Sequence, residues 1–314
     1  MRLRRCLKFT SSALAAVAVF LATGMLLLAW TVPDVSPLAS QLPERTSYMR
    51  ERAATQGLPL DTYSIEPMEV VTSAPLLVCA VVKSEDVSFF LHDGLDWDQL
   101  VNALFAMRRK VMGASTITQQ LARNLYLSPE QTLVRKLREV FIARELEQKL
   151  SKPRILEIYL NVIEWDTEGW GIAYAAHHYF HKAPPELDVF EVSFLSALIP
   201  APRQPLQGGN LARAERVQRR VIYQLYASGI IEEREWHQAI GRSWSTFACL
   251  RQGRPLEEAL TCTQPPKEAD AERPPLRVRL EEAPLPRDAW LETGCGVARN
   301  LREARRPDAR RRPE

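Results

Sequence analysis

The chain has little net charge and few cysteines for its 314 residues. Its 41 lysines and arginines nearly balance its 38 aspartates and glutamates, and the net charge of +3 gives no argument for a nucleic-acid partner. None of the five cysteines belongs to a Cys-x-x-Cys pair, so the usual spacing of a zinc site is absent. Cys249 and Cys262 could instead form a disulfide outside the cytoplasm. Cys79 lies in an apolar run and is interpreted as a buried small residue.

Glycine is also scarce, with 13 in the whole chain, and apolar residues recur mostly three and four positions apart. This spacing predicts a mostly α-helical protein. Only the apolar run 76–82 also fits a buried strand, and a buried helix explains it equally well.

One long uncharged segment stands near the amino terminus. Residues 13–30 carry no charge, and a helix of that length spans about 27 Å, close to the hydrocarbon core of a bilayer. Cations precede it, which places the amino terminus in the cytoplasm and the main domain outside. We therefore predict a basic cytoplasmic segment at 1–12, a transmembrane helix at 13–32 and a lead-in at 33–64. A cleaved signal peptide fits less well, because the run is long and lacks a small-x-small cleavage site.

The other end of the chain has a different composition. Residues 246–314 are rich in proline, arginine and glutamate, and residues 263–314 show no convincing helix or strand pattern. We interpret 246–314 as a solvated, disordered tail. The folded domain is then expected at 65–245.

The residues that best indicate chemistry lie in three blocks. The first begins with Glu85 and Asp86, the second is the run of small, hydroxyl, amide and cationic residues at 113–124, and the third is the charged run 135–139. Carboxylates on either side of such a surface suit glycosyl transfer between phosphorylated sugars. One acid deprotonates an acceptor hydroxyl, and fixed cations stabilise the departing pyrophosphate.

In this order, and with the further blocks 151–161 and 171–182, the chain resembles the peptidoglycan glycosyltransferases. These occur as a domain of bifunctional penicillin-binding proteins and as monofunctional enzymes. The resemblance covers roughly residues 65–240. It implies a lysozyme-like, two-lobed helical domain that polymerises lipid II into β-1,4-linked glycan and releases undecaprenyl diphosphate. The Ser-x-x-Lys, Ser-x-Asn and Lys-Thr-Gly set of a penicillin-binding domain does not follow, so a monofunctional enzyme is expected.

The resemblance makes Glu85 the general base. Glu85 follows a wholly apolar run, so its carboxylate is expected at the rim of the core, where partial desolvation raises its proton affinity. On a continuous helix Glu85, Phe89 and His92 would share one face. The alternative is helix capping, with Ser84 or Asp86 as the N-cap and Glu85 in the first turn.

Glu139 corresponds to the second essential acid of the family. It falls on an apolar stripe that runs from Ile142 to Leu150, where a carboxylate is costly unless it is paired or used. We expect it to orient Arg135 and Lys136 on a phosphate-binding face, or to assist departure of the leaving group. The alternative is a purely structural bridge to Arg135, one turn earlier.

The remaining binding residues come from the same blocks. Their hydroxyls and amides suit sugar hydroxyls and phosphate oxygens, and their cations suit the donor pyrophosphate. The predicted substrate-binding residues are Ser115, Thr116, Gln119, Gln120, Arg123, Arg135, Lys136 and Asn161. Ser115 and Thr116 also fit a plain helix N-cap, and Arg123 also fits a solvated face.

Two positions depart from the family pattern. Ala114 stands where the family usually has a second glycine, and Gln131 stands where it usually has an arginine, eight residues before the second acid. A phosphate-contacting cation is therefore missing, or is replaced by Arg135, Lys136 or Arg138.

No cofactor is required by the resemblance, although a divalent cation, Mg²⁺ or Mn²⁺, that bridges the pyrophosphate fits the chemistry. A dedicated metal site is not expected. His177 and His181 have an i, i+4 spacing that suits a metal, but no acidic or thiol third ligand stands near them in the sequence.

The expected partners are lipid II, the growing lipid-linked glycan, membrane lipids and other proteins of cell-wall synthesis. The protein is expected in the inner membrane, with one span and a periplasmic catalytic domain. Segment 97–110 is apolar with a basic end, which suits a membrane interface, and core packing explains it equally well.

Two other functions compete with this one. A lytic enzyme of the same general fold would cleave glycan, and the cationic residues argue against it. A catalytically weak membrane scaffold for cell-wall assembly is favoured by Ala114 and Gln131, and the retention of both acids argues against it.

Overall fold

The computed structural model describes residues 16, 19–20, 22–96, 115–263 and 295. The predicted basic segment 1–12, the segment 97–110, Ala114 and most of the predicted tail lie outside these residues. Within the predicted span, residues 22–30 are helical. No helix in the described part of the chain is both long and apolar enough to cross a bilayer.

The described chain is built from helices, which confirms the mostly α prediction. The run 76–82 lies in a helix, and the β-type pairing found in the described ranges is one isolated bridge between Glu164 and Trp170. The 3₁₀ helices are η1 (Ser36–Ala39), η2 (Phe89–Leu91) and η3 (Pro184–Glu186). The α-helices are α2 (Ser47–Gln56), α3 (Val70–Ser73), α4 (Pro75–Glu85), α6 (Ile117–Tyr126), α7 (Leu133–Lys149), α8 (Lys152–Val162), α9 (Ile172–Phe180), α10 (Val189–Leu198), α11 (Gly208–Ala227), α12 (Glu233–Arg251) and α13 (Leu256–Leu260).

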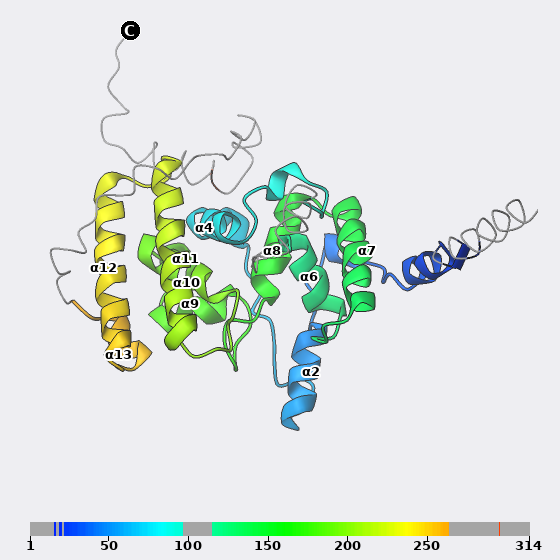
Figure 1. Cartoon of the computed structure of the whole chain (residues 1–314), viewed down its shortest axis with the longest axis horizontal. Coiled ribbons are helices and arrows are strands. Elements are labelled where there is room, and N and C mark those ends of the chain that lie inside the picture. The colour runs from blue at the N-terminus through cyan, green and yellow to red at the C-terminus, as the bar shows by residue number, and fades with distance from the viewer. Residues whose placement is uncertain (1–15, 17–18, 21, 97–114, 264–294, 296–314) are drawn as a thin grey trace, which may run out of the picture.

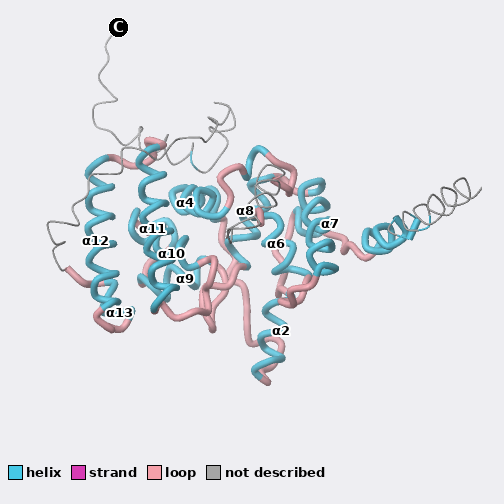
Figure 2. Tube along the Cα trace, in the orientation of Figure 1, coloured by secondary structure: helices cyan, strands magenta, loops and turns pink. Residues whose placement is uncertain are grey.

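The helices form two groups with α4 between them (Figure 1). In one group α6 packs against α7, α8 and α2, and in the other α10, α11 and α12 pack against one another. Helix α4 packs against α10 and α11, and Figure 2 shows loops linking the two groups. One buried apolar cluster draws residues from both groups, so the two share a core.

Helix α10 explains why α4 sits at the centre of the molecule. Every residue from Val189 to Leu198 is buried, so α10 offers an apolar surface on all sides. Its two serines satisfy their hydroxyls within the helix, since Ser193 donates to the Phe190 carbonyl and Ser196 to the Val192 carbonyl. Helix α4, which is also largely buried, packs on this surface and carries its last residue, Glu85, to the boundary between the groups.

The folded body extends beyond the predicted domain 65–245 in both directions. The predicted lead-in contains α2, which begins with the Thr46 cap and ends at Gly57 in the left-handed region (φ 67°). The predicted tail contains the end of α12 and all of α13. The sequences of these two segments gave no sign of this packing, although each segment buries residues against the rest of the folded domain.

The cysteines form two disulfides. The bond predicted between Cys249 and Cys262 is confirmed. The interpretation of Cys79 as a simple buried residue is wrong, because it is bonded to Cys295 across 216 residues of sequence. Both partners are almost fully buried, and Cys295 is thereby attached to α4. A separation of this size leaves no spacing signal in the sequence.

Candidate active site

Glu85 is the last residue of α4 and is partly buried. Its carboxylate accepts hydrogen bonds from Gln120 Nε2 (3.0 Å) and Ser84 Oγ (3.1 Å). Burial raises the pKa of the Glu85 carboxyl, and these two hydrogen bonds lower it again in part. Arg220 and Arg213 of α11 add weaker attraction for the charged form. Such a carboxylate binds a proton more readily than an exposed glutamate.

The prediction that Glu85, Phe89 and His92 share one helical face is wrong, because α4 ends at Glu85 and η2 follows after a break. The capping alternative is wrong as well, since Glu85 lies in the last turn of its helix. Asp86 does cap a helix, but that helix is α6, which is distant in sequence, and not the helix that contains Glu85. Its Oδ2 accepts a hydrogen bond from the backbone nitrogen of Ile117, at the start of α6 (2.9 Å).

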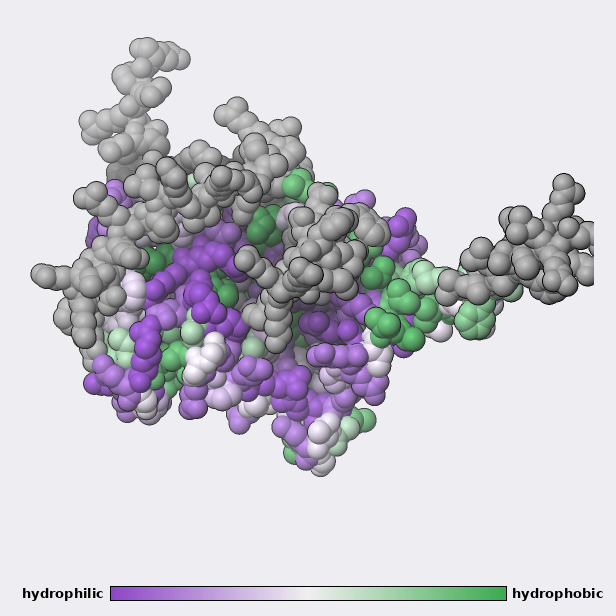
Figure 3. All heavy atoms as spheres, in the orientation of Figure 1, coloured by the Kyte–Doolittle hydropathy of each residue, from purple (hydrophilic) through white to green (hydrophobic). Residues whose placement is uncertain are grey.

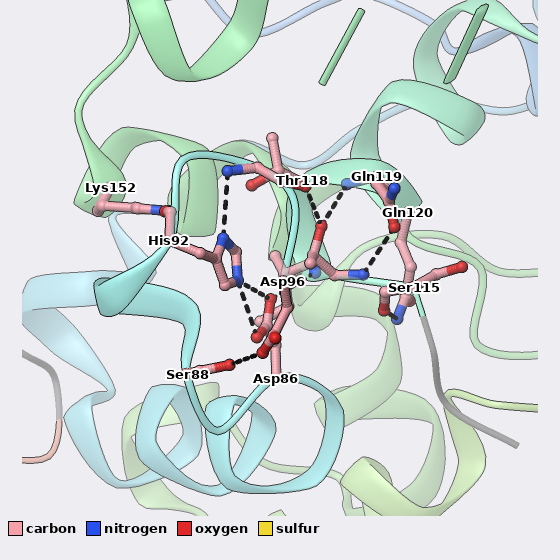
Figure 4. Close-up of polar contacts among 12 residues, drawn as sticks. Asp86, Ser88, His92, Asp96, Ser115, Thr118, Gln119, Gln120 and Lys152 are labelled. Carbon is pink, nitrogen blue, oxygen red and sulfur yellow. Dashed lines mark hydrogen bonds and ion pairs between the residues drawn. The ribbon is translucent and has the colours of Figure 1, made fainter. Parts of the chain in front are cut away.

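His92 holds Asp86 in this position (Figure 4). His92 Nδ1 accepts a hydrogen bond from the backbone nitrogen of Gly94 (3.1 Å), so Nε2 carries the proton and donates to the Asp86 carboxylate (3.0 Å). Thr116 Oγ1 then donates to the Gly94 carbonyl (2.8 Å). The segment that follows Glu85 is therefore fastened to the beginning of α6.

The predicted substrate-binding residues at the start of α6 are of two kinds, those that cap the helix and those that line a cleft. Thr116 is the N-cap, and its hydroxyl and the Gln119 side chain form a reciprocal capping box (3.1 Å in each direction). Both side chains are buried. Ser115 and Gln120, by contrast, line a cleft. Thr116 therefore caps the helix, as the alternative interpretation predicted, and Gln119 takes part in the same cap.

Glu139 is fully buried on α7, as its place in the apolar stripe predicted. Its Oε2 accepts a hydrogen bond from Arg135 Nη1 (2.5 Å), and its Oε1 accepts one from Lys136 Nζ. The salt bridge between Glu139 and Arg135 thus exists, but Glu139 also forms a second ion pair, with Lys136. Lys136 Nζ also donates to Ser115 Oγ (3.0 Å), which joins α7 to the start of α6.

A series of hydrogen bonds through Gln120, Ser115 and Lys136 connects the two acids, which stand 54 residues apart in sequence. Gln120 Nε2 donates to Glu85 and also contacts the Ser115 carbonyl (3.4 Å). The Ser115 hydroxyl accepts from Lys136, and Lys136 donates to Glu139. The sequence blocks that contain these residues therefore meet at one site.

The cleft beside this network has a volume of about 800 Å³. Its lining is Tyr48, Ser115, Gln120, Arg123, Asn124, Pro129, Gln131, Thr132, Leu133, Arg135, Lys136, Tyr159, Ile163, Glu164, Ile199, Pro200, Ala201, Pro202, Arg203 and Gln204. Arg123 has no ion-pair partner within the described ranges, so its charge is available to a ligand. Gln131 lies on the same lining as Arg135 and Lys136.

Asn161 lies away from this cleft and is fully buried on α8. Its amide nitrogen donates to the carbonyls of Met68 (2.9 Å) and Glu157 (2.8 Å), and its Oδ1 accepts from the Met68 nitrogen (2.9 Å). A Cβ atom on Gly171 would come within 2.6 Å of the Asn161 carbonyl oxygen, and Gly171 has φ 78°. The Asn161 side chain therefore anchors the chain before α3, and its backbone leaves room only for glycine at position 171.

Three residues of the site were missed by the sequence analysis. Tyr159 is fully buried, and its hydroxyl donates to Gln120 Oε1 (2.8 Å), which turns the Gln120 nitrogen toward Glu85. Glu164 and Arg203 form an ion pair on the cleft lining (2.8 Å). Tyr159 lies in the block 151–161 and could have been selected there, whereas Glu164 and Arg203 belong to no motif.

The histidine pair does not assemble a metal site. The rings of His177 and His181 lie 5.9 Å apart, and His178 Nε2 lies 3.5 Å from Asp166 Oδ2. The described residues contain no group of three histidine, cysteine, aspartate or glutamate side chains that could hold a metal ion.

These features define a helical protein in which a partly buried carboxylate, Glu85, is linked by hydrogen bonds to a cleft lined by a cluster of cations. Comparison with known proteins identifies the family. The transglycosylase family model matches residues 57–226, which is more than half of the chain. The chain belongs to this transglycosylase family.

Three relatives indicate how far the similarity extends. The biosynthetic peptidoglycan transglycosylase of Alcanivorax borkumensis is 38% identical over 202 residues, which cover 63% of this chain and 78% of that protein. The protein of the same name from Nitrosospira multiformis is 44% identical over 133 residues, covering 41% of this chain and 58% of the relative. Penicillin-binding protein 1A of Rickettsia prowazekii is 33% identical over 221 residues, which cover 67% of this chain but 27% of the relative.

Proposed function

We infer that the protein is a peptidoglycan glycosyltransferase that polymerises lipid II into β-1,4-linked glycan strands and releases undecaprenyl diphosphate. The observation that carries this inference is the hydrogen-bond chain from Glu85 to the pair of cations held by Glu139, beside a cleft large enough for a sugar and a diphosphate. Membership of the transglycosylase family supports it. A lytic enzyme releases no diphosphate and would have no use for three cations, Arg123, Arg135 and Lys136, on the cleft lining.

We propose that Glu85 is the general base. The acceptor 4-hydroxyl oxygen attacks C1 of the donor sugar from the face opposite the diphosphate, and its proton passes to Glu85. The bond between C1 and the diphosphate oxygen breaks, the electron pair leaves with the diphosphate, and the configuration at C1 is inverted. Hydrogen bonds from Gln120 and Ser84 favour the ionised form of Glu85 and partly offset the effect of its burial.

Arg123, Arg135 and Lys136 are proposed to bind the donor diphosphate. Negative charge grows on the leaving group as the bond breaks, so fixed cations stabilise the transition state more than the ground state. Glu139 positions two of them, and its negative charge keeps the pair from repelling each other before substrate arrives. Thr116, Gln119 and Asn161 act indirectly, by holding α6 and the chain before α3.

A divalent cation, if the reaction uses one, would bind through the diphosphate of the substrate. The carboxylates at and beside the cleft are already engaged by donors and cations. Glu164, on the lining, is paired with Arg52 and Arg203. Glu139 is paired with Arg135 and Lys136, and Glu85 accepts a hydrogen bond from Gln120. No step in the proposed mechanism depends on a metal ion.

Gln131→Arg is expected to raise turnover or donor affinity several-fold, because it would add a charge-assisted hydrogen bond to the diphosphate. The measurement is the initial rate of lipid II polymerisation over a range of substrate concentrations. Gln131→Met is the matched control, since it alters the same side chain without adding charge. A rate for Gln131→Arg equal to or below wild type would mean that the existing cations already fill the site.

The protein is proposed to reside in the cell envelope, anchored in the inner membrane with its catalytic domain in the periplasm. Apolar side chains on the first turns of α7 support a membrane-facing surface, since Leu133 is 86% exposed, Val134 57% and Leu137 40%. Figure 3 shows hydrophobic side chains gathered where the amino-terminal helical segment leaves the body.

The mature protein is expected to keep residues 13–30 and to resist extraction from inner-membrane fractions by high salt or alkali. Mass spectrometry of the purified protein gives its first residue directly. A terminus near residue 30 or 40 would instead show that a signal peptide had been removed, and it would refute the anchor.

A further inference from the structure

Helix α2 contributes one aromatic side chain, Tyr48, to the cleft that contains Arg123 and Arg135. The sequence analysis gave no chemical role to the segment that holds this helix. In the structure α2 packs against α6, the helix that carries Gln120 and Arg123. The segment before the predicted domain therefore forms part of the cleft wall.

The position of Tyr48 is fixed by contacts on the rest of its helix. The Tyr48 ring packs against a small cluster formed by Met49, Ala53, Tyr63 and Trp170, all of them buried. Arg52 Nη2 forms an ion pair with the buried Glu164 (2.5 Å), and Arg52 Nη1 donates to the Thr167 carbonyl (3.1 Å). These apolar and ionic contacts hold α2 in place and restrict the orientation of the Tyr48 side chain.

The Tyr48 hydroxyl is placed to donate to an anion. Among the described residues it has no hydrogen-bond partner. Burial raises the pKa of Tyr48, and attraction from Arg123, Arg135 and Arg203 offsets this in part, so the phenol remains protonated at neutral pH. An anion attracted by these guanidinium groups could therefore accept a hydrogen bond from the Tyr48 hydroxyl.

We propose that the Tyr48 hydroxyl donates a hydrogen bond to an oxygen of the donor diphosphate, next to Arg123 and Arg135. This inference rests on the proposed function, and it adds a substrate-binding residue from α2. A sugar hydroxyl could accept the same bond, but the strongest acceptor that the three guanidinium groups would hold at this end of the cleft is a phosphate oxygen. Because charge grows there as the C1–oxygen bond breaks, the hydroxyl should lower the barrier as well as aid binding.

Tyr48→Phe tests the proposal, because it removes one oxygen and keeps the ring that packs on the cluster. We expect kcat for lipid II polymerisation to fall about tenfold, the loss of one hydrogen bond to a charged group, with an unchanged melting temperature. Affinity for inorganic pyrophosphate, measured by calorimetry, should weaken at least threefold. Tyr63→Phe is the matched control. Its hydroxyl donates to Gln56 (2.5 Å) in the same cluster and does not line the cleft, so its kcat and pyrophosphate affinity should stay within twofold of wild type.

Wild-type kcat and pyrophosphate affinity in Tyr48→Phe would overturn the proposal, as would equal losses in Tyr48→Phe and Tyr63→Phe. Failure of the wild-type protein to polymerise lipid II would overturn the proposed function instead. In that case the pyrophosphate measurements alone decide whether Tyr48 belongs to an anion site.

Discussion

Glu85→Gln is expected to abolish polymerisation of lipid II while leaving the fold intact. Glutamine keeps the shape of the side chain and can still accept a hydrogen bond from Gln120, but it cannot take the acceptor's proton. Loss of a general base costs about 10²- to 10⁴-fold in rate. Polymer yield is measured after electrophoretic separation of the glycan, and thermal unfolding reports on the fold.

Glu157→Gln is the matched control for this experiment. Burial also raises the pKa of Glu157, but its carboxylate accepts a hydrogen bond from the Val71 nitrogen (3.1 Å) and takes no part in the hydrogen bonds that join Glu85 to Gln120, Ser115 and Lys136. Its activity should stay near wild type. A polymer yield from Glu85→Gln within tenfold of wild type would remove Glu85 from the role of base.

The raised pKa of Glu85 also gives a direction for the pH profile of the wild-type enzyme. The base must be ionised, so activity is lost as pH falls through its pKa. Because that pKa lies above the ordinary glutamate value of about 4.3, the acidic limb should appear at a higher pH than an exposed glutamate would give.

Glu139→Gln is expected to reduce both activity and stability. The amide cannot balance the charges of Arg135 and Lys136, which would remain next to each other on α7. Breaking a buried ion pair costs about 3–5 kcal/mol, and the partial exposure of Lys136 reduces this to about 2–3 kcal/mol. The rate should fall at least about 100-fold, because the two cations lose their fixed position beside the diphosphate.

Glu145→Gln is the control on the same helix, since Glu145 takes no part in the cluster. Activity is measured well below the melting temperature of the weakest variant, so that folding and catalysis are separated. If Glu139→Gln lost stability but kept the wild-type rate, the Arg135–Glu139 bridge would be purely structural.

Features that depend on near neighbours in sequence were predictable. The apolar run 76–82, which ends three residues before Glu85, predicted a carboxylate at the rim of the core, and the apolar stripe of α7 predicted that Glu139 faces inward. The capping box of Thr116 and Gln119 was also readable, as a threonine followed three residues later by a glutamine. In each case the physical cause acts within one or two helical turns.

Features that depend on distant partners were not predictable. Helix α4 stops at Glu85, and the next residue, Asp86, turns away to cap α6 at Ile117, 31 residues later. The role of α2 was not predictable for the same reason. Its cap and terminal glycine are ordinary helix signals, but only the packing on α6 and the Arg52–Glu164 pair place Tyr48 in the cleft.

If Glu85 and the diphosphate-binding cations form one site, the protein should polymerise lipid II. The most direct test incubates the purified full-length protein, reconstituted in lipid vesicles, with labelled lipid II and resolves polymer, monomer and released undecaprenyl diphosphate. We expect glycan polymer and one undecaprenyl diphosphate for each sugar–sugar bond formed, and neither product with Glu85→Gln. Unchanged lipid II, or shortening of added glycan strands without release of the diphosphate, would contradict it.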